Sequence, residues 1–316
     1  MNTLRLNPDD TGMQSAADLL SAGECVAIPT ETVYGLAADA RQGQAVARIY
    51  AAKGRPSFNP LIVHVPDADA AAAIADLAPQ ARALADAFWP GPLTMVLPLR
   101  ADAGIASLVT AGLDTIGLRV PAHPAARDLL RRFGGPLAAP SANASGRISP
   151  TSADHVLSPD GGLDGRIAAV LDAGPCAVGV ESTIMGWPEG TATLLRPGGI
   201  AAEDIETVLG APVARHQGDP SRPSAPGQLS SHYAPNAALR LDVTDPLPHE
   251  THIAFGQPGP FTLSASGDLS EAAARLFDML RRADLAGRPI SVAPIPEGGL
   301  GAAINDRLRR AAAPRD

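Results

Sequence analysis

The sequence predicts an α/β protein with two domains. Strand-length apolar runs alternate with segments of helical periodicity as far as residue 209, and a second such alternation begins at residue 237. Between them, residues 211–236 are rich in Pro, Ser, Gly and Gln, which is typical of a linker. We therefore expect a large domain over residues 1–210, a linker over 211–236 and a small α/β domain over 237–316.

The composition argues against several classes of protein. The net charge is -8, which argues against a protein that grips nucleic acid over a broad surface but allows a local cationic pocket. Cys25 and Cys176 lie in apolar runs, so we expect buried free thiols in a reducing compartment. No apolar run is long enough to span a membrane, and the first residues lack an apolar signal core. These features predict a cytoplasmic protein.

Local signals predict the elements of the first domain in order. Val46, Ile49 and Tyr50 have helical spacing, and Gly54 is a natural stop for that helix. Pro124 suits the first turn of another helix. The predicted helices cover residues 14–22, 43–53, 68–88, 124–133, a segment capped by Thr151 or Ser152, and 201–209. The predicted strands cover residues 25–28, 61–65, 93–99, 115–120, 136–139, 167–172, 178–185 and 193–196.

The second domain repeats this alternation on a smaller scale. Apolar strand-length runs cover residues 239–243, 252–255 and 290–295, and helical patterns cover 270–282 and 300–310. Alternating strands and helices over about 80 residues predict a small α/β unit.

The stretch from Ile28 to Asp39 is the first candidate for a site. It reads I-P-T-E-T-V-Y-G-L-A-A-D, so a strand and a proline are followed by hydroxyl, carboxylate and hydroxyl groups. Polar residues at the carboxyl end of a strand often face a ligand in α/β proteins. Taken alone, the stretch fits a polar turn without a ligand equally well.

No known catalytic signature supplies a nucleophile, a metal site or a phosphate-binding glycine loop. The chain offers instead cations and neutral donors on loops and strand ends: Lys53, Arg55, Asn59, Thr115, Arg119, Ser141, Arg147, Ser149 and Arg196. Such a set suits a polyphosphate and a carboxylate, and would act by positioning and charge neutralisation. Lys53 is the only lysine beside 24 arginines, which indicates a need for a compact ammonium, although chance explains it too.

Several of these residues could instead have purely structural roles. Arg119 could pair with a structural carboxylate, His64 could be a core histidine, and Tyr233 could pack the linker onto a domain. The S-A-N-A-S-G segment alone could be a surface loop. From the residues alone, the sequence predicts an α/β protein with an anion-binding groove.

Six motifs in this order resemble the YrdC-type threonylcarbamoyl-AMP synthases: P-T-E-T-V-Y-G-L (29–36), K-G-R-P…N-P-L (53–61), R-V-P (119–121), P-S-A-N-A-S-G (140–146), E-S-T-I (181–184) and R-P-G (196–198). The S-H-Y-A-P linker and G-L-G-A-A-I-N-D-R-L (299–308) resemble the longer two-domain form. The resemblance implies a twisted open mixed sheet with a concave cationic groove, plus a small Rossmann-like C-terminal domain. It also implies synthesis of threonylcarbamoyl-AMP and pyrophosphate from L-threonine, bicarbonate or CO2, and ATP.

The resemblance also implies roles for individual residues. The threonine side would use Thr32, His64, Arg119, the backbone at Ala139, and Ser182. The ATP side would use Lys53, Arg55, Asn59, Thr115, Ser141, Ser149, Arg196 and Tyr233. Lys53 and Arg55 would lie near the triphosphate and act in catalysis, and the linker would close over the groove as a lid. Glu31 stays open between orienting the amine, holding a metal and bracing the turn.

Cofactors and partners follow from the same resemblance. We expect Mg2+ with ATP, no metal site made by the protein and no tightly bound organic cofactor. A separate tRNA threonylcarbamoyltransferase complex would receive the product, so neither strong direct tRNA binding nor a membrane is expected. The rival is an RNA-binding module with a cationic groove, against which the charge of -8 weighs. A carbamoyltransferase of hydrogenase maturation would need Cys-rich zinc motifs, which two cysteines cannot supply.

Overall fold

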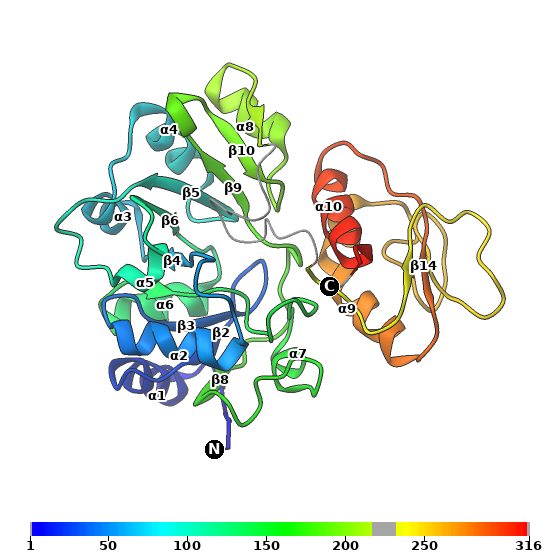
Figure 1. Ribbon diagram of the computed structural model, residues 1–316, viewed down its shortest axis with the longest axis horizontal. Coiled ribbons are helices and arrows are strands. Elements are labelled where there is room, and N and C mark those ends of the chain that lie inside the picture. The colour runs from blue at the N-terminus through cyan, green and yellow to red at the C-terminus, as the bar shows by residue number, and fades with distance from the viewer. Residues whose placement is uncertain (1, 217–231, 315–316) are drawn as a thin grey trace.

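The computed structural model describes residues 2–216 and 232–314, which form two lobes (Figure 1). Within the described residues, the larger lobe contains an eleven-stranded mixed sheet and the smaller lobe a three-stranded parallel sheet. The predicted α/β class with a second, smaller α/β unit is therefore confirmed. The boundaries at residues 210 and 236 stay predictions, and residues 217–231 of the expected linker and lid lie outside the described residues.

The large sheet brings the polar motifs to one region. Gly35 bridges to Ser141, so the stretch over residues 28–39 lies against the P-S-A-N segment. β4 and β6 are parallel, and His64 and Arg119 are register partners there. The strand order is β1 (Leu4–Leu6), β8 (Ala169–Leu171), β2 (Val26–Ile28), β3 (Gly35–Asp39), β7 (Leu137–Ala138), β4 (Ile62–His64), β6 (Thr115–Arg119), β5 (Leu93–Pro98), β9 (Thr183–Gly186), β10 (Thr193–Arg196) and β11 (Ala214–Arg215).

Helices with strong end signals begin and end where the sequence predicts. α2 ends at Gly54, whose φ of 61° is left-handed, and Ser152 caps α7 through the backbone N–H of His155. The helices of this lobe are α1 (Asp10–Ser21), α2 (Gly43–Lys53), α3 (Ala68–Ile74), α4 (Pro79–Phe88), α5 (Ser107–Thr110), α6 (Pro124–Phe133), α7 (Ala153–Leu157), the 3-10 turn η1 (Pro188–Gly190) and α8 (Ala202–Leu209).

Three local predictions need correction. The expected helix over 68–88 is wrong: Ala75 leaves the helical region to bridge Leu99, and α4 starts afresh with Pro79 in its first turn. The strand expected over 178–185 begins only at Thr183, so the polar residues before it belong to a loop. β3 was not predicted, because its G-L-A-A-D sequence has few residues that favour strands.

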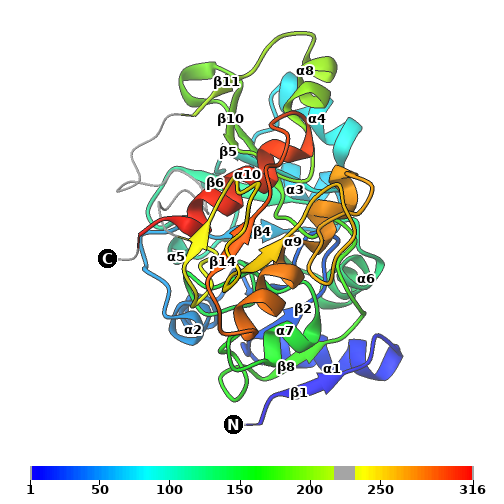
Figure 2. The same ribbon diagram turned by 90° about the vertical axis from the view of Figure 1, so that its right-hand side faces the viewer.

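The C-terminal lobe is a small parallel sheet covered by two helices. β14 (Ile290–Val292) lies between β12 (Leu239–Arg240) and β13 (Thr251–Ile253). Figure 1 shows α9 (Leu269–Leu285) and α10 (Leu300–Ala312) on the side that faces the large lobe, and Figure 2 shows this lobe from its outer side. Its own apolar core includes Leu276, Phe277, Leu280, Ile304 and Leu308.

Two further expectations concern the cysteines and the membrane. Cys25 and Cys176 are both buried and free, as the sequence predicts. Across residues 2–216 and 232–314, no helix combines the length and the apolar character that crossing a bilayer requires.

Candidate active site

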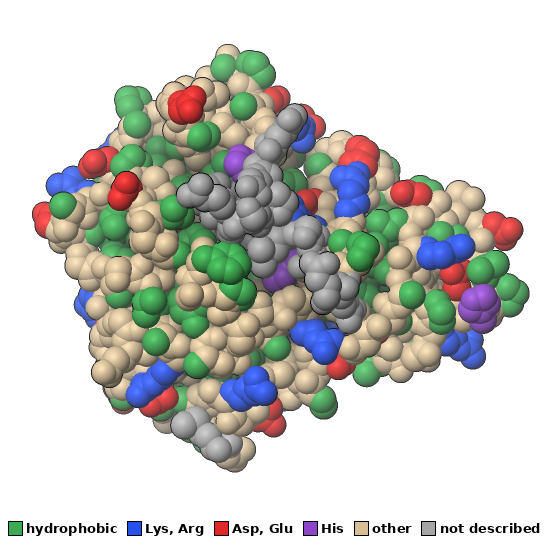
Figure 3. Space-filling model, in the orientation of Figure 1, with side chains coloured by type: hydrophobic (Ala, Val, Ile, Leu, Met, Phe, Trp, Pro, Cys, Tyr) green, Lys and Arg blue, Asp and Glu red, His purple; other side chains and the backbone are tan. Residues whose placement is uncertain are grey.

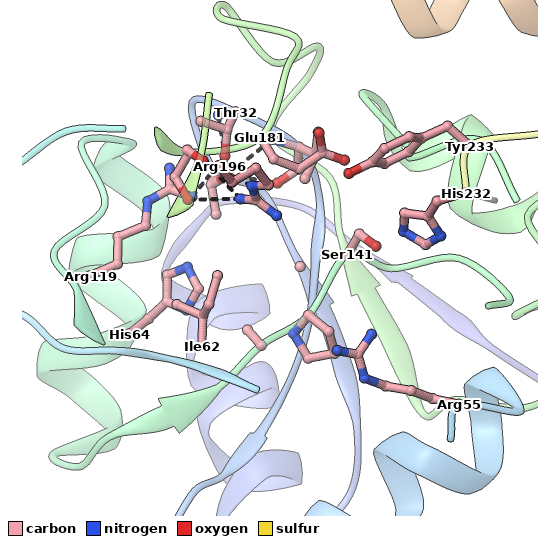
Figure 4. Close-up of a pocket in the computed structure, with 16 residues that line it drawn as sticks. Thr32, Arg55, Ile62, His64, Arg119, Ser141, Glu181, Arg196, His232 and Tyr233 are labelled. Carbon is pink, nitrogen blue, oxygen red and sulfur yellow. Dashed lines mark hydrogen bonds between the residues drawn. The ribbon is translucent and has the colours of Figure 1, made fainter. Parts of the chain in front are cut away.

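A cavity lies where polar loops at the strand ends of the large sheet converge (Figure 4). It is lined by Thr30, Thr32, Val33, Gly35, Arg55, Ile62, His64, Arg119, Ala139, Pro140, Ser141, Glu181, Ser182, Arg196, His232 and Tyr233. Of the residues expected to bind threonine or ATP, all belong to this lining except Lys53, Asn59, Thr115 and Ser149, and the candidate cation Arg147 also lies outside it. The structure thus brings together residues from all six motifs and from the S-H-Y-A-P linker.

One side of the cavity is built around Arg119. Its Nη1 donates to Thr32 Oγ1 at 2.8 Å, and its Nη2 donates to Glu31 Oε1 at 2.6 Å. The other carboxylate oxygen of Glu31 accepts the backbone N–H of Ala122. Burial alone would raise the pKa of Glu31, but the charge and hydrogen bond of Arg119 outweigh it and the pKa is lowered. Glu31 is therefore ionised, and it holds the guanidinium in place.

His64 lies beside Arg119 and is neutral. Burial, together with the positive charge of Arg119, lowers the pKa of His64 to about 3. Its Nδ1 is buried without a hydrogen-bond partner among the described residues. A neutral imidazole with an open nitrogen can exchange a hydrogen bond with a substrate without adding charge. Ser182 completes this side, since its hydroxyl lies 2.7 Å from Thr94 Oγ1.

The other side of the cavity carries arginines. Arg196 is buried and its Nη2 donates to the carbonyl oxygen of Ser182 at 2.8 Å. Arg55 is held by the carbonyl oxygens of Asn59 and Pro60. Burial lowers the pKa of Arg55 and of Arg196 to about 10, so both remain charged near neutral pH. Fixed guanidinium groups in a buried site are suited to phosphate oxygens.

Four predicted residues lie outside the lining. Lys53 is buried, and its Nζ donates to the carbonyl oxygens of Ser141 at 2.5 Å and Asn143 at 2.6 Å. Ser149 donates to Glu181 Oε1 at 2.5 Å. Asn59 and Thr115 lie nearby on the loop after α2 and at the start of β6. In this structure Lys53 supports the loop that carries Ser141, because both of its hydrogen bonds go to that loop.

Within residues 28–39, some side chains line the cavity and others lie in the core. Gly35 lines the cavity, and a Cβ at this position would lie 3.2 Å from that of Ala139. Tyr34 is instead fully buried, and its hydroxyl donates to the carbonyl oxygen of Gly174. Gly35 is the first residue of β3, whereas Tyr34 precedes the strand and belongs to the apolar core of the large lobe.

Sequence reasoning assigned no role to three residues at this site. Glu181 and His232 line the cavity, and Arg307 from α10 contacts Glu181. Glu181 had a signal, because it opens the E-S-T-I motif. Arg307 had one as well, because it belongs to the G-L-G-A-A-I-N-D-R-L motif (299–308), whereas Arg309 and Arg310 follow that motif. Figure 4 shows Tyr233 and His232 on the opposite side from Arg119, with the Tyr233 hydroxyl toward Glu181.

The carboxylates near the cavity do not form a metal centre. Among the described residues, no group of three or more His, Cys, Asp or Glu side chains has a geometry that could hold a metal ion. Glu31 and Glu181 are each paired with an arginine. The donor set within residues 2–216 and 232–314 therefore does not fit a resident metal ion.

Comparisons with known proteins cover both lobes. A family model described as telomere recombination matches residues 18–198, and one described as threonylcarbamoyl-AMP synthase, C-terminal domain, matches residues 200–313. The threonylcarbamoyl-AMP synthase of Bacillus subtilis is 42% identical over 99% of this chain and 96% of its own length. That of Pyrococcus abyssi is 40% identical over 94% and 92%. The crystal structure of P. abyssi Sua5 complexed with L-threonine is similar, with a TM-score of 0.87, 37% identity and coverage of 99% and 98%.

Proposed function

The chain belongs to the family of threonylcarbamoyl-AMP synthases, and on that premise we propose that its cavity joins L-threonine, bicarbonate or CO2, and ATP into threonylcarbamoyl-AMP and pyrophosphate. The observation that carries the proposal is the pairing of two unlike sides in one cavity. Arg119, Thr32 and His64 offer a cation, a hydroxyl and a neutral imidazole, whereas Arg55 and Arg196 offer only positive charge. The first set fits an amino acid, and the second fits a polyphosphate.

Threonine binds, in this proposal, against Arg119. The guanidinium receives the carboxylate, and Glu31 keeps it oriented while the Thr32 contact gives way. Neutral His64 and Ser182 face the remaining polar groups of threonine. Ala139 contributes its backbone to the same side. Burial of these groups strengthens each hydrogen bond, because water does not compete for it.

ATP occupies the arginine side. Arg55 and Arg196 lie against the phosphates, Ser141 donates its hydroxyl, and Tyr233 packs over the nucleotide from the linker. Asn59, Thr115 and Ser149 complete the proposed ATP side, where Asn59 holds Arg55 through its carbonyl oxygen and Ser149 donates to Glu181. Magnesium enters with ATP as part of the substrate, because the protein's carboxylates are already paired.

The chemistry uses groups of the substrates. The threonine amine attacks the carbon of CO2 and loses a proton, which gives a carbamate. A carbamate oxygen then attacks the α-phosphorus of ATP, the bond to the β-phosphate oxygen breaks, and pyrophosphate leaves. Arg55 and Arg196 stabilise the charge that grows on the leaving phosphates. This division of labour explains why the chain needs no nucleophile of its own.

The product is passed, we propose, to a separate transferase that modifies the adenosine beside the anticodon in tRNA. A net charge of -8 is compatible with a protein that does not hold tRNA itself. Basic side chains on the visible described surface lie scattered among acidic ones (Figure 3). Arg119 and Arg196 are buried, which disfavours the rival of a cationic groove for RNA.

The decisive experiment is pyrophosphate release from ATP with each amino acid, with and without bicarbonate. We expect release only when L-threonine and bicarbonate are both present. Release that needs neither would overturn the proposal. Steeply salt-dependent binding of tRNA by the isolated protein would favour the RNA-binding alternative.

A further inference from the structure

The proposed ATP side of the cavity contains a negative charge. Glu181 is the one carboxylate among the described residues that line the cavity, and it is 7% exposed. Burial alone would raise the pKa of Glu181, but Arg307 and Arg196 outweigh it and the pKa is lowered. Glu181 is therefore an anion close to where a polyanion must bind. Left without a counter-charge, it would repel the phosphates, and in a buried site this repulsion is weakly screened.

The counter-charge comes from the other lobe. Arg307 on α10 is 0% exposed, and its Nε donates to Glu181 Oε2 at 2.9 Å. Its Nη1 donates to the carbonyl oxygen of Pro197, next to Arg196. The guanidinium carbon also lies 5.7 Å from the centre of the Tyr233 ring. One side chain of the small lobe thus touches three segments of the proposed ATP side.

The lobes are docked beside the same site residues. Val33, Ile148 and Val180 of the large lobe pack into the apolar core of the small lobe. Each is the chain neighbour of a polar site residue, namely Thr32, Ser149 and Glu181. Docking of the small lobe therefore fixes the backbone of all three positions, and Arg307 arrives in a defined place.

Glu181 connects this docking to the nucleotide. Its Oε1 accepts the hydrogen bond of Ser149, and its Oε2 accepts that of Arg307, so both oxygens are held by partners within the protein. A carboxylate fixed and neutralised in this way leaves the positive charge of Arg55 and Arg196 for the phosphates. Without Arg307, the nearest cation for Glu181 would be one of the arginines that ATP needs.

We propose that Arg307 of the C-terminal lobe is a positioning residue for ATP, which neutralises Glu181 and so completes the nucleotide side of the active site. This inference rests on the proposed function. Arg307 does not itself contact ATP in this account. Its effect passes through Glu181, and that sets it apart from the arginines that line the cavity.

The test is a double-mutant cycle on the full chain. Arg307→Met keeps the length of the side chain and removes its charge. We expect it to raise the KM for ATP by about tenfold or more and to leave the KM for threonine within about twofold, because a buried anion is left unpaired. Adding Glu181→Gln removes that anion, so the double variant should regain most of the ATP affinity. Arg309→Met, on the same helix in an exposed pair with Glu297, is the matched control and should change neither constant.

One measurement and one further variant keep the outcomes separate. Binding of ATP by calorimetry does not depend on turnover, so it tests the role of Arg307 even if the variant is inactive. If Arg307→Met does not fold, Arg307→Lys retains the positive charge at this position. Three results would each overturn the inference. They are an equal rise in both KM values, an unchanged ATP affinity in Arg307→Met, and a double variant that binds ATP no more tightly than Arg307→Met does. Absence of threonine-dependent pyrophosphate release by the unmodified protein would instead count against the proposed function.

Discussion

Arg119, at the end of β6, and Glu31, in the loop between β2 and β3, form a buried ion pair with 2.6 Å between Nη2 and Oε1. The sequence left two readings open for Arg119, a structural ion pair and a contact to a carboxylate ligand. The structure contains the ion pair, and Nη1 additionally reaches Thr32 in the cavity. A guanidinium fixed by one carboxylate can present its other edge to a second, so the two readings are compatible.

Replacing Arg119 should therefore affect threonine first. We expect Arg119→Ala to raise the KM for threonine by roughly 30-fold or more, since a buried charge pair with the ligand is lost, with the KM for ATP within about threefold. Steady-state pyrophosphate release gives both constants. The same substitution in a Glu31→Gln background avoids an unpaired buried carboxylate and controls for folding. A larger effect on ATP than on threonine would contradict the assignment.

Glu31 should act through Arg119. Glu31→Gln keeps the shape but leaves the guanidinium without its charge partner, so we expect the unfolding free energy to fall by roughly 3 kcal/mol and the threonine KM to rise. Denaturant unfolding and the same kinetic assay measure these effects. Glu24→Gln, in the more exposed pair with Arg48, should change both very little. Unchanged threonine binding in Glu31→Gln would show that Arg119 needs no orienting partner.

The predictable parts of this protein were those with local causes. Gly54 stops α2 and Pro124 opens α6, and each signal is written within a few residues. The pairing of Glu181 with Arg307 joins positions 126 apart in sequence. The motif at 299–308 contains Arg307 but not Arg309 or Arg310, yet the partner of Arg307 depends on how the two lobes dock. The resemblance therefore included both residues in its motifs, but it did not predict that Arg307 pairs with Glu181.

The resemblance implies that Lys53 lies near the triphosphate of ATP, and its contacts in the structure allow this role to be tested. Both of its hydrogen bonds in this structure go to backbone carbonyl oxygens of residues 141 and 143. Lys53→Met should thus lower the unfolding free energy by roughly 1–3 kcal/mol, since two buried hydrogen bonds are lost, and should raise the ATP KM as the Ser141 loop loosens. Gln44→Met, exposed on the same helix, is the control. Slower turnover at unchanged stability would instead favour direct contact of Lys53 with the triphosphate.

Buried histidines should make the fold sensitive to acid. Burial lowers the pKa of His64 and of His232 to about 3. The unfolded chain takes up these protons near pH 6.5 and the folded chain only near 3, so the unfolding free energy should fall as the pH drops between those values. The slope is roughly 1.4 kcal/mol per pH unit for each histidine. Urea unfolding at pH 6.5 and 5 should show His64→Gln with a smaller loss than the unmodified protein, and exposed His249→Gln with the same loss. Equal losses in all three proteins would contradict a neutral, buried His64.

Gly179 offers a way to move the small lobe without touching a charge. Its φ is 76°, and a Cβ there would lie 2.4 Å from the carbonyl oxygen of Ala273 in α9. Backbone atoms cannot yield at that distance, so Gly179→Ala must push α9 away from the loop that carries Glu181. Because Arg307 docks with the same lobe, we expect a higher ATP KM together with a lower melting temperature.

Gly174→Ala is the matched control for this substitution. Gly174 has a φ of 82° in the same part of the chain, but a Cβ there meets nothing within 4 Å. The Gly174→Ala variant therefore has the backbone strain of a left-handed alanine but no clash. That strain costs about 1 kcal/mol. Both variants should therefore lose some stability, whereas only Gly179→Ala should weaken ATP binding. An unchanged ATP KM in a folded Gly179→Ala protein would mean that lobe docking and nucleotide binding are independent.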